Sequence, residues 1–153
     1  MPGAKEIFEM DKKLESKGVR FEYPTFAATI SRSSGTNSAY SKRLAAKSKP
    51  FRRAIDMGVM KEEDQLELVK DVFAEKCVLN WETLIAGEWK EGIWPEDAGE
   101  KVTEKDETKV QLLPCTYENV LKVFNELPDV FTSLLQDSRD LANYRKDDGA
   151  AKN

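Results

Sequence analysis

Apolar residues recur at helical spacing along most of the chain. The spacing predicts helices over residues 4–16, 37–49, 50–58, 60–80, 116–127 and 129–145. Between residues 19 and 30 the period changes to alternation, which predicts short strands interrupted by Pro24. We therefore expect a mainly α fold, with five or six helices in a compact bundle, a minor N-terminal strand element and a long acidic loop.

A polar stretch interrupts the helical pattern. Residues 96–109 hold six acids and three lysines with only two apolar residues, so no helical face can be drawn there. We expect residues 1–145 to form a single helical domain with a flexible insertion at about 86–113. Residues 146–153 are expected to be a disordered tail.

A shared core is predicted for six apolar side chains, because each falls on the apolar side of its segment. They are Phe73, Trp81, Val120, Phe124, Phe131 and Leu135. Trp81 directly follows the strongest helical pattern, over residues 60–80, whose first turn carries three acids that the helix dipole favours.

All three tryptophans of the chain fall in residues 80–94, "NWETLIAGEWKEGIW". Trp81 is predicted to be core. Trp89 and Trp94 either fold back over the core as part of a compact loop or stay exposed as anchors for a partner. An aromatic cage for a cationic ligand needs converging rings and acids, and nothing in this spacing makes them converge.

The residue types exclude several kinds of chemistry. The chain has no histidine, which removes His-dependent catalysis and His-based zinc sites. Its two cysteines, Cys77 and Cys115, lie far apart, and we expect both to be reduced. There is no nucleotide-binding motif, no apolar run long enough to span a bilayer and no secretory signal pattern. We expect no enzyme activity, cofactor, metal or membrane site, and a cytoplasmic location.

Charge is divided unevenly along the chain. The net charge is −4, but residues 1–58 carry +6 and residues 59–153 carry −10. Residues 37–58 hold six basic residues against one acid, with aromatic residues between them. This segment either binds nucleic acid or is a solvated face that complements the acidic half or an acidic partner. The candidate partner contacts are Lys42, Arg43, Arg52, Arg53, Trp89 and Trp94.

The order of segments carries a family resemblance. "FAATISR" is followed by "NSAYSKRL", "KPFRRAIDMGVM", a segment ending in "VLNWETL" and, after a variable loop, "CTYENVLKVFNELPDVFTSLLQDSRDLANYR". This order resembles small tail assembly chaperones of long-tailed, siphovirus-like bacteriophages. The resemblance covers most of residues 26–145 and rests on Trp81, on residues 116–131 and on the closing pair Tyr144-Arg145. The long acidic insertion departs from it.

The resemblance implies a non-enzymatic helical protein that binds the tape measure and tail tube proteins during assembly in the host cytoplasm. Such a chaperone is not retained in the finished particle. Two alternatives stay open: a small structural component of the virion, in the tail or at the head-tail junction, and a nucleic-acid-binding regulator that uses residues 37–58. Self-association into a homo-oligomer is also open.

Overall fold

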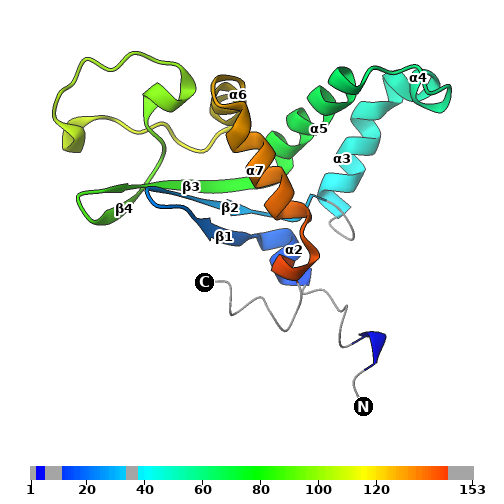
Figure 1. Ribbon diagram of the computed structural model, residues 1–153, viewed down its shortest axis with the longest axis horizontal. Helices are drawn as coiled ribbons and strands as arrows, with labels where there is room; N and C mark the ends of the chain where they lie inside the picture. Colours follow the sequence, from blue (N-terminus) through cyan, green and yellow to red (C-terminus); the bar gives the residue numbers. More distant parts are fainter. Residues whose placement is uncertain (1–2, 6–11, 34–37, 145–153) are drawn as a thin grey trace.

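A four-stranded antiparallel sheet organises the chain (Figure 1). The computed structural model describes residues 3–5, 12–33 and 38–144. The strands lie in the order β1-β2-β3-β4, with bounds β1 (Val19–Glu22), β2 (Phe26–Ile30), β3 (Val78–Ile85) and β4 (Glu88–Glu91). The expected mainly α bundle is therefore wrong, because a sheet and not a helix pair forms the base on which the helices pack.

Helices occupy two places relative to this sheet. α6 and α7 lie over one face, and α3 and α5 form an arm that extends beyond the end of the strands (Figure 1). The bounds are α2 (Lys12–Lys17), α3 (Ser38–Ser48), α4 (Arg52–Asp56), α5 (Glu62–Lys76), α6 (Tyr117–Glu126) and α7 (Pro128–Arg139). Short 3₁₀ turns are η1 (Lys49–Phe51), η2 (Pro95–Ala98), η3 (Glu107–Lys109) and η4 (Leu141–Tyr144).

The largest correction concerns residues 78–91, which form a β-hairpin. The sequence predicted a helix to residue 80 and then an irregular insertion, but α5 ends at Lys76 and β3 begins at Val78. The turn between β3 and β4 is Ala86-Gly87, with φ angles of 51° and 80°, as in a type I′ turn. Ala-Gly is a weaker sequence signal for a hairpin than Asn-Gly. The helical spacing of apolar residues in α5 therefore extended the predicted helix into the start of β3.

Other predicted elements are confirmed. Both N-terminal strands form where alternation predicted them, and the amide of Gly18 caps α2 by donating to Leu14 O at 2.9 Å. The side chain of Thr116 accepts a hydrogen bond from the Asn119 amide and so caps α6. The predicted tail, residues 146–153, and Arg145 lie outside the described residues, as does part of the first predicted helix.

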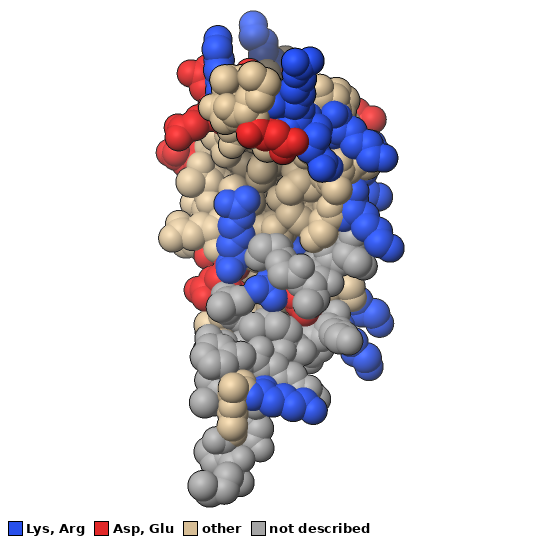
Figure 2. Space-filling view, turned by 90° about the vertical axis from the view of Figure 1, so that its right-hand side faces the viewer, with Lys and Arg blue, Asp and Glu red and all other residues tan. Residues whose placement is uncertain are grey.

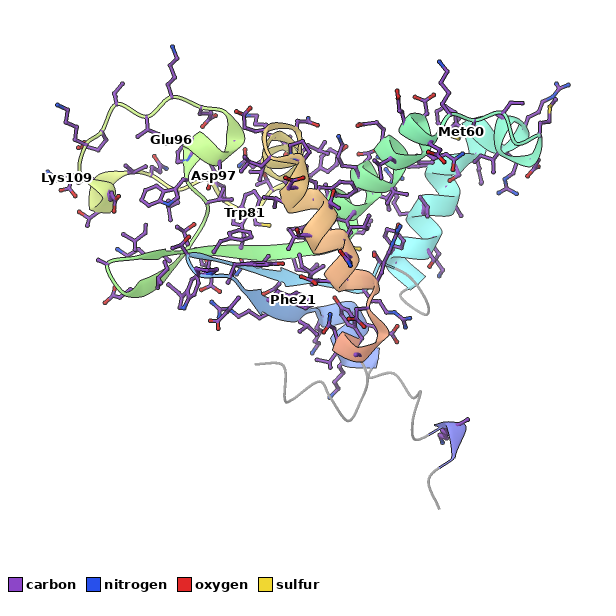
Figure 3. All side chains as sticks on the ribbon, in the orientation of Figure 1. Phe21, Met60, Trp81, Glu96, Asp97 and Lys109 are labelled. Atoms are coloured by element: carbon purple, nitrogen blue, oxygen red, sulfur yellow. The ribbon has the colours of Figure 1, made fainter. Side chains whose placement is uncertain are left out.

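The predicted core is confirmed, and Trp81 is central to it. All six side chains predicted to share a core belong to one buried cluster. Phe73, Phe124 and Phe131 contact one another with ring centroids 5.2–6.0 Å apart. Trp81 lies between β3 and the helices above it (Figure 3) and is 2% exposed. Its Nε1–H donates to Leu113 O at 3.0 Å, which satisfies the one polar group of the buried ring.

The insertion is a loop with fixed ends. Ile93 and Leu113 exchange two backbone hydrogen bonds of 3.0 and 2.8 Å, which close the loop at its base. The first turn, η2, packs on α6, and its Ala98 is 8% exposed. From residue 99 to 109 the chain is exposed except for the half-buried Val102. The solvated loop predicted from the acidic composition is thus shorter than residues 96–109.

Replacing Trp81 with Ala should lower the free energy of unfolding by about 3–5 kcal/mol, because it leaves a cavity and removes one of the two hydrogen bonds to the Leu113 carbonyl. Chemical denaturation monitored by circular dichroism measures this change. Trp89, which is only half-buried on β4, is the matched control, and Trp89→Ala should cost clearly less. Equal losses in the two variants would contradict the central place of Trp81.

Deleting residues 100–109 with a short Gly/Ser bridge should leave the helix content and melting temperature nearly unchanged. The Ile93–Leu113 pair already closes the loop, and shortening a solvated loop changes its closure entropy by less than about 1 kcal/mol. Deleting residues 96–109 should lower the melting temperature further, because it also removes the buried Ala98. A collapse of the circular dichroism signal in the shorter deletion would show that the exposed loop is structural.

Candidate partner-binding site

The basic segment predicted from the sequence is split in two by the fold. On α3, Arg43 Nε lies 3.0 Å from Glu75 Oε2, and Lys47 Nζ lies 2.6 Å from Asp71 Oδ2 and 3.5 Å from Glu75 Oε2. These pairs fasten α3 to α5. Part of the basic segment, residues 37–58, therefore complements acids of the other half of the same chain.

The protonation states of these pairs follow from their contacts. The hydrogen bond to Asp71 raises the pKa of Lys47. Partial burial opposes ionisation of Asp71 and Glu75, but hydrogen bonds from Lys47, Tyr117 and Arg43 lower the pKa of both carboxyls. These shifts favour the charged forms of Lys47, Asp71 and Glu75. Arg43 is engaged inside the molecule by its ion pair with Glu75.

A second group of cations faces water. Lys42 on α3, Lys49 on η1, and Arg52 and Arg53 on α4 are exposed. Within the described part of the chain, none of them takes part in an ion pair within 4.0 Å. Of the four predicted basic contacts, Lys42, Arg52 and Arg53 thus remain available to a partner.

Exposed apolar side chains gather at the same end of the arm. We call residues 49–66, which comprise η1, α4 and the start of α5, the tip. Its large exposed hydrophobic side chains are Phe51, Ile55, Met57, Val59 and Leu66, and Met57 and Val59 are 64% and 65% exposed. Figure 2, which looks onto this side, shows uncharged surface at the top bordered by Lys and Arg, with Asp and Glu nearby. An exposed apolar patch with a charged rim marks an interaction surface.

A groove continues this surface away from the tip. It lies between α5 and α6, and its apolar lining includes Phe51, Leu68, Tyr117 and Leu121. Phe51 belongs to both the tip and the groove, so the two surfaces are continuous. The lining also includes the charged side chains of Asp64, Glu67, Lys70 and Asp71, and a groove between two helices that combines apolar and charged side chains can accept an amphipathic helix.

Trp89 and Trp94 are half-buried, so neither is fully packed in the core and neither is fully exposed. The guanidinium of Arg20 lies 4.7 Å from the centroid of the Trp89 ring, on the sheet face that also carries the Arg20–Glu82 ion pair. One face of this ring is therefore occupied within the molecule. Trp94 precedes the buried Pro95 at the start of η2.

The fold does not bring the six candidate contacts together. Lys42, Arg43, Arg52 and Arg53 belong to the arm, whereas Trp89 and Trp94 belong to the hairpin and loop at the opposite end (Figure 1). In Figure 3, Met60 at the tip and Lys109 on the loop mark these two ends. Partner binding by any of the six stays a prediction, but a single compact site can include only the basic ones.

The exposed apolar side chains of the tip were missed by the sequence analysis. The segment "AIDMGVM", residues 54–60, is apolar at most positions, and the sequence predicted a helix of the bundle over residues 50–58. At about 100° per residue its apolar positions, 54, 55, 57, 59 and 60, are spread around the helix and do not form one face. That spread was the available indication of an exposed patch.

The part of the chain that the structure describes contains no group of three or more His, Cys, Asp or Glu side chains able to hold a metal ion. Cys77 and Cys115 are free thiols, and burial raises the pKa of each to about 12, so neither is a ready nucleophile. Among the described helices, none is long and apolar enough to cross a membrane.

Comparison with known proteins gives one match. A family model described as YdaY prophage protein matches residues 35–152, which include the whole arm, β3, β4, the loop and the C-terminal helices. No curated protein and no solved structure matches the chain. The matched segment is well over half of the 153 residues, and the chain therefore belongs to the YdaY prophage protein family.

Proposed function

We propose that this phage-derived protein is a non-enzymatic tail assembly chaperone. It binds the tape measure and tail tube proteins of its phage in the host cytoplasm and leaves before the particle is complete. The observation that carries the proposal is the tip, where exposed apolar side chains and unpaired cations coincide at the end of a projecting arm. Membership of a prophage family and the resemblance to phage chaperones support the choice of partners.

The tip suits transient capture of another protein. Met57 and Val59 expose apolar surface that no contact in the fold requires, and its removal from water is worth about 25 cal/mol per Å². Arg52 and Arg53 beside them attract acidic side chains of a partner that carries both signs of charge, and they accelerate association. The groove lined by Phe51, Leu68 and Leu121 offers a further apolar contact for a partner helix.

The tip favours a protein partner over nucleic acid. Glu62, Glu63 and Asp64 are exposed in the first turn of α5, next to the basic residues of α4. A phosphate backbone at the tip would lie close to these carboxylates, and the repulsion between the like charges would weaken its binding. A regulator that binds DNA or RNA through residues 37–58 is therefore a weaker explanation of the same surface.

Reversing Arg52 and Arg53 to Glu should slow the capture of a tape measure fragment from the same prophage while leaving the fold unchanged. The reason is that exposed charges at the rim of an interface act mainly on the association rate, which at low salt should fall about tenfold or more. Surface plasmon resonance at two salt concentrations measures the rate, and the difference between the proteins should shrink at high salt.

Lys101→Glu/Lys105→Glu is the matched control, because it makes the same change in net charge on the exposed loop at the other end of the molecule. It should capture the fragment at the wild-type rate. If the wild-type protein never co-purifies with tape measure or tail tube protein at low salt, the chaperone proposal fails. Mass spectrometry of purified particles then decides for a virion component if the protein is present in stoichiometric amount.

A further inference from the structure

The tip carries equal numbers of positive and negative side chains. Residues 49–66 contain four cations, Lys49, Arg52, Arg53 and Lys61, and four acids, Asp56, Glu62, Glu63 and Asp64. All eight side chains are exposed. In the described residues none of the eight forms an ion pair within the chain, so the tip presents both signs of charge around an apolar centre.

The two signs are separated along the tip. Arg52 and Arg53 are at the start of α4, and Glu62 and Glu63 are in the first turn of α5, with the exposed Met57 and Val59 in the turn between the helices. The acids at the start of α5 are also favoured by the dipole of that helix. Asp56 and Lys61 carry the opposite sign to their neighbours, but residues 49–56 still have a net charge of +2 and residues 61–64 a net charge of −2. The order from one helix to the next is therefore net cationic, apolar, net anionic.

A surface with this order is complementary to itself. In a two-fold contact the same patch is used by both partners, so that residue i of one copy meets residue j of the other and the reverse. Placing two tips antiparallel sets the arginines of each copy against the glutamates of the other and buries the apolar turns together. A uniformly charged partner would instead meet like charges on half of the rim.

We propose that a second copy of this chain covers the tip in the free protein, in a two-fold pair. Arg52 and Arg53 of each copy pair with Glu62 and Glu63 of the other, and Met57 and Val59 form the apolar centre. The pairing rests on the tip alone and not on the chaperone function. It adds one property to that function: a captured protein that uses the tip displaces the second copy.

The test is a charge swap in the full-length chain, followed by sedimentation velocity at a series of concentrations. Wild type should show a concentration-dependent monomer–dimer equilibrium. Arg52→Glu/Arg53→Glu places acids at all four of the pairing positions 52, 53, 62 and 63, and Glu62→Lys/Glu63→Lys places cations at all four. Each variant alone should dimerise at least about tenfold more weakly, because like charges then face each other.

An equimolar mixture of the two variants should recover the dimer as a heterodimer, since at positions 52, 53, 62 and 63 one copy carries acids and the other carries cations. The protein with all four substitutions should recover the homodimer. Met57→Ser/Val59→Ser should weaken the pair without changing its charge, and Lys101→Glu/Lys105→Glu should dimerise like wild type. Circular dichroism of each variant checks that the fold is kept, as expected for exposed positions.

Three results would overturn the pairing. The wild-type protein could stay monomeric up to several hundred micromolar, either charge-reversed variant could dimerise like wild type on its own, or the equimolar mixture of the two variants could fail to associate. The outcome is separable from that of the chaperone proposal. Recovery of the dimer in the mixture without any capture of tape measure fragment supports the pair and rejects the chaperone. Capture by a strictly monomeric protein does the reverse.

Discussion

The pairing of β2 with β3 is the constraint on which the rest of the structure depends. These neighbouring strands are separated by residues 31–77, so the whole arm is an insertion between two hydrogen-bonded strands. Ile30 pairs with Val78, and the amide of Ser31 donates to Cys77 O at 2.9 Å. The chain leaves the sheet and returns to it at one point. The two long helices must therefore run out and back, and the end of the arm is held away from the sheet.

This constraint also binds the N-terminal segment to the family-matched part of the chain. The match begins at residue 35, after β2, yet β3 carries Trp81 and needs β2 along its length. Glu15 and Arg32 fix the start of the arm through a buried ion pair of 2.8 Å, in which the side chains are 2% and 7% exposed. Removing one member of such a pair leaves a buried charge. Residues before the match are thus part of the same folding unit.

Sequence patterns gave the core more reliably than the architecture. Phe124 and Phe131 lie on helices whose apolar stripe has a period of 3.6, and their burial followed directly. Trp81 was correctly predicted to be in the core, but it was expected just after a helix and it lies on β3. Trp81, Thr83 and Ile85 are the buried alternate positions of this strand. The strand begins directly after α5, so the apolar pattern of the helix continues into it. The cations of α3 and α4 look alike in sequence. Only the position of α5 shows that some are paired and others free.

The location of the exposed apolar residues decides what they mean. Leu79 is also exposed, but it lies on a strand within the sheet, where a single exposed leucine needs no explanation. Ile55, Met57 and Val59 lie beyond the reach of α6, α7 and the sheet, so no rearrangement of the core is needed to explain them. Polar residues there would leave the fold intact and lower the exposed apolar area. A group of exposed apolar side chains at the end of a projecting arm is the pattern of a binding surface.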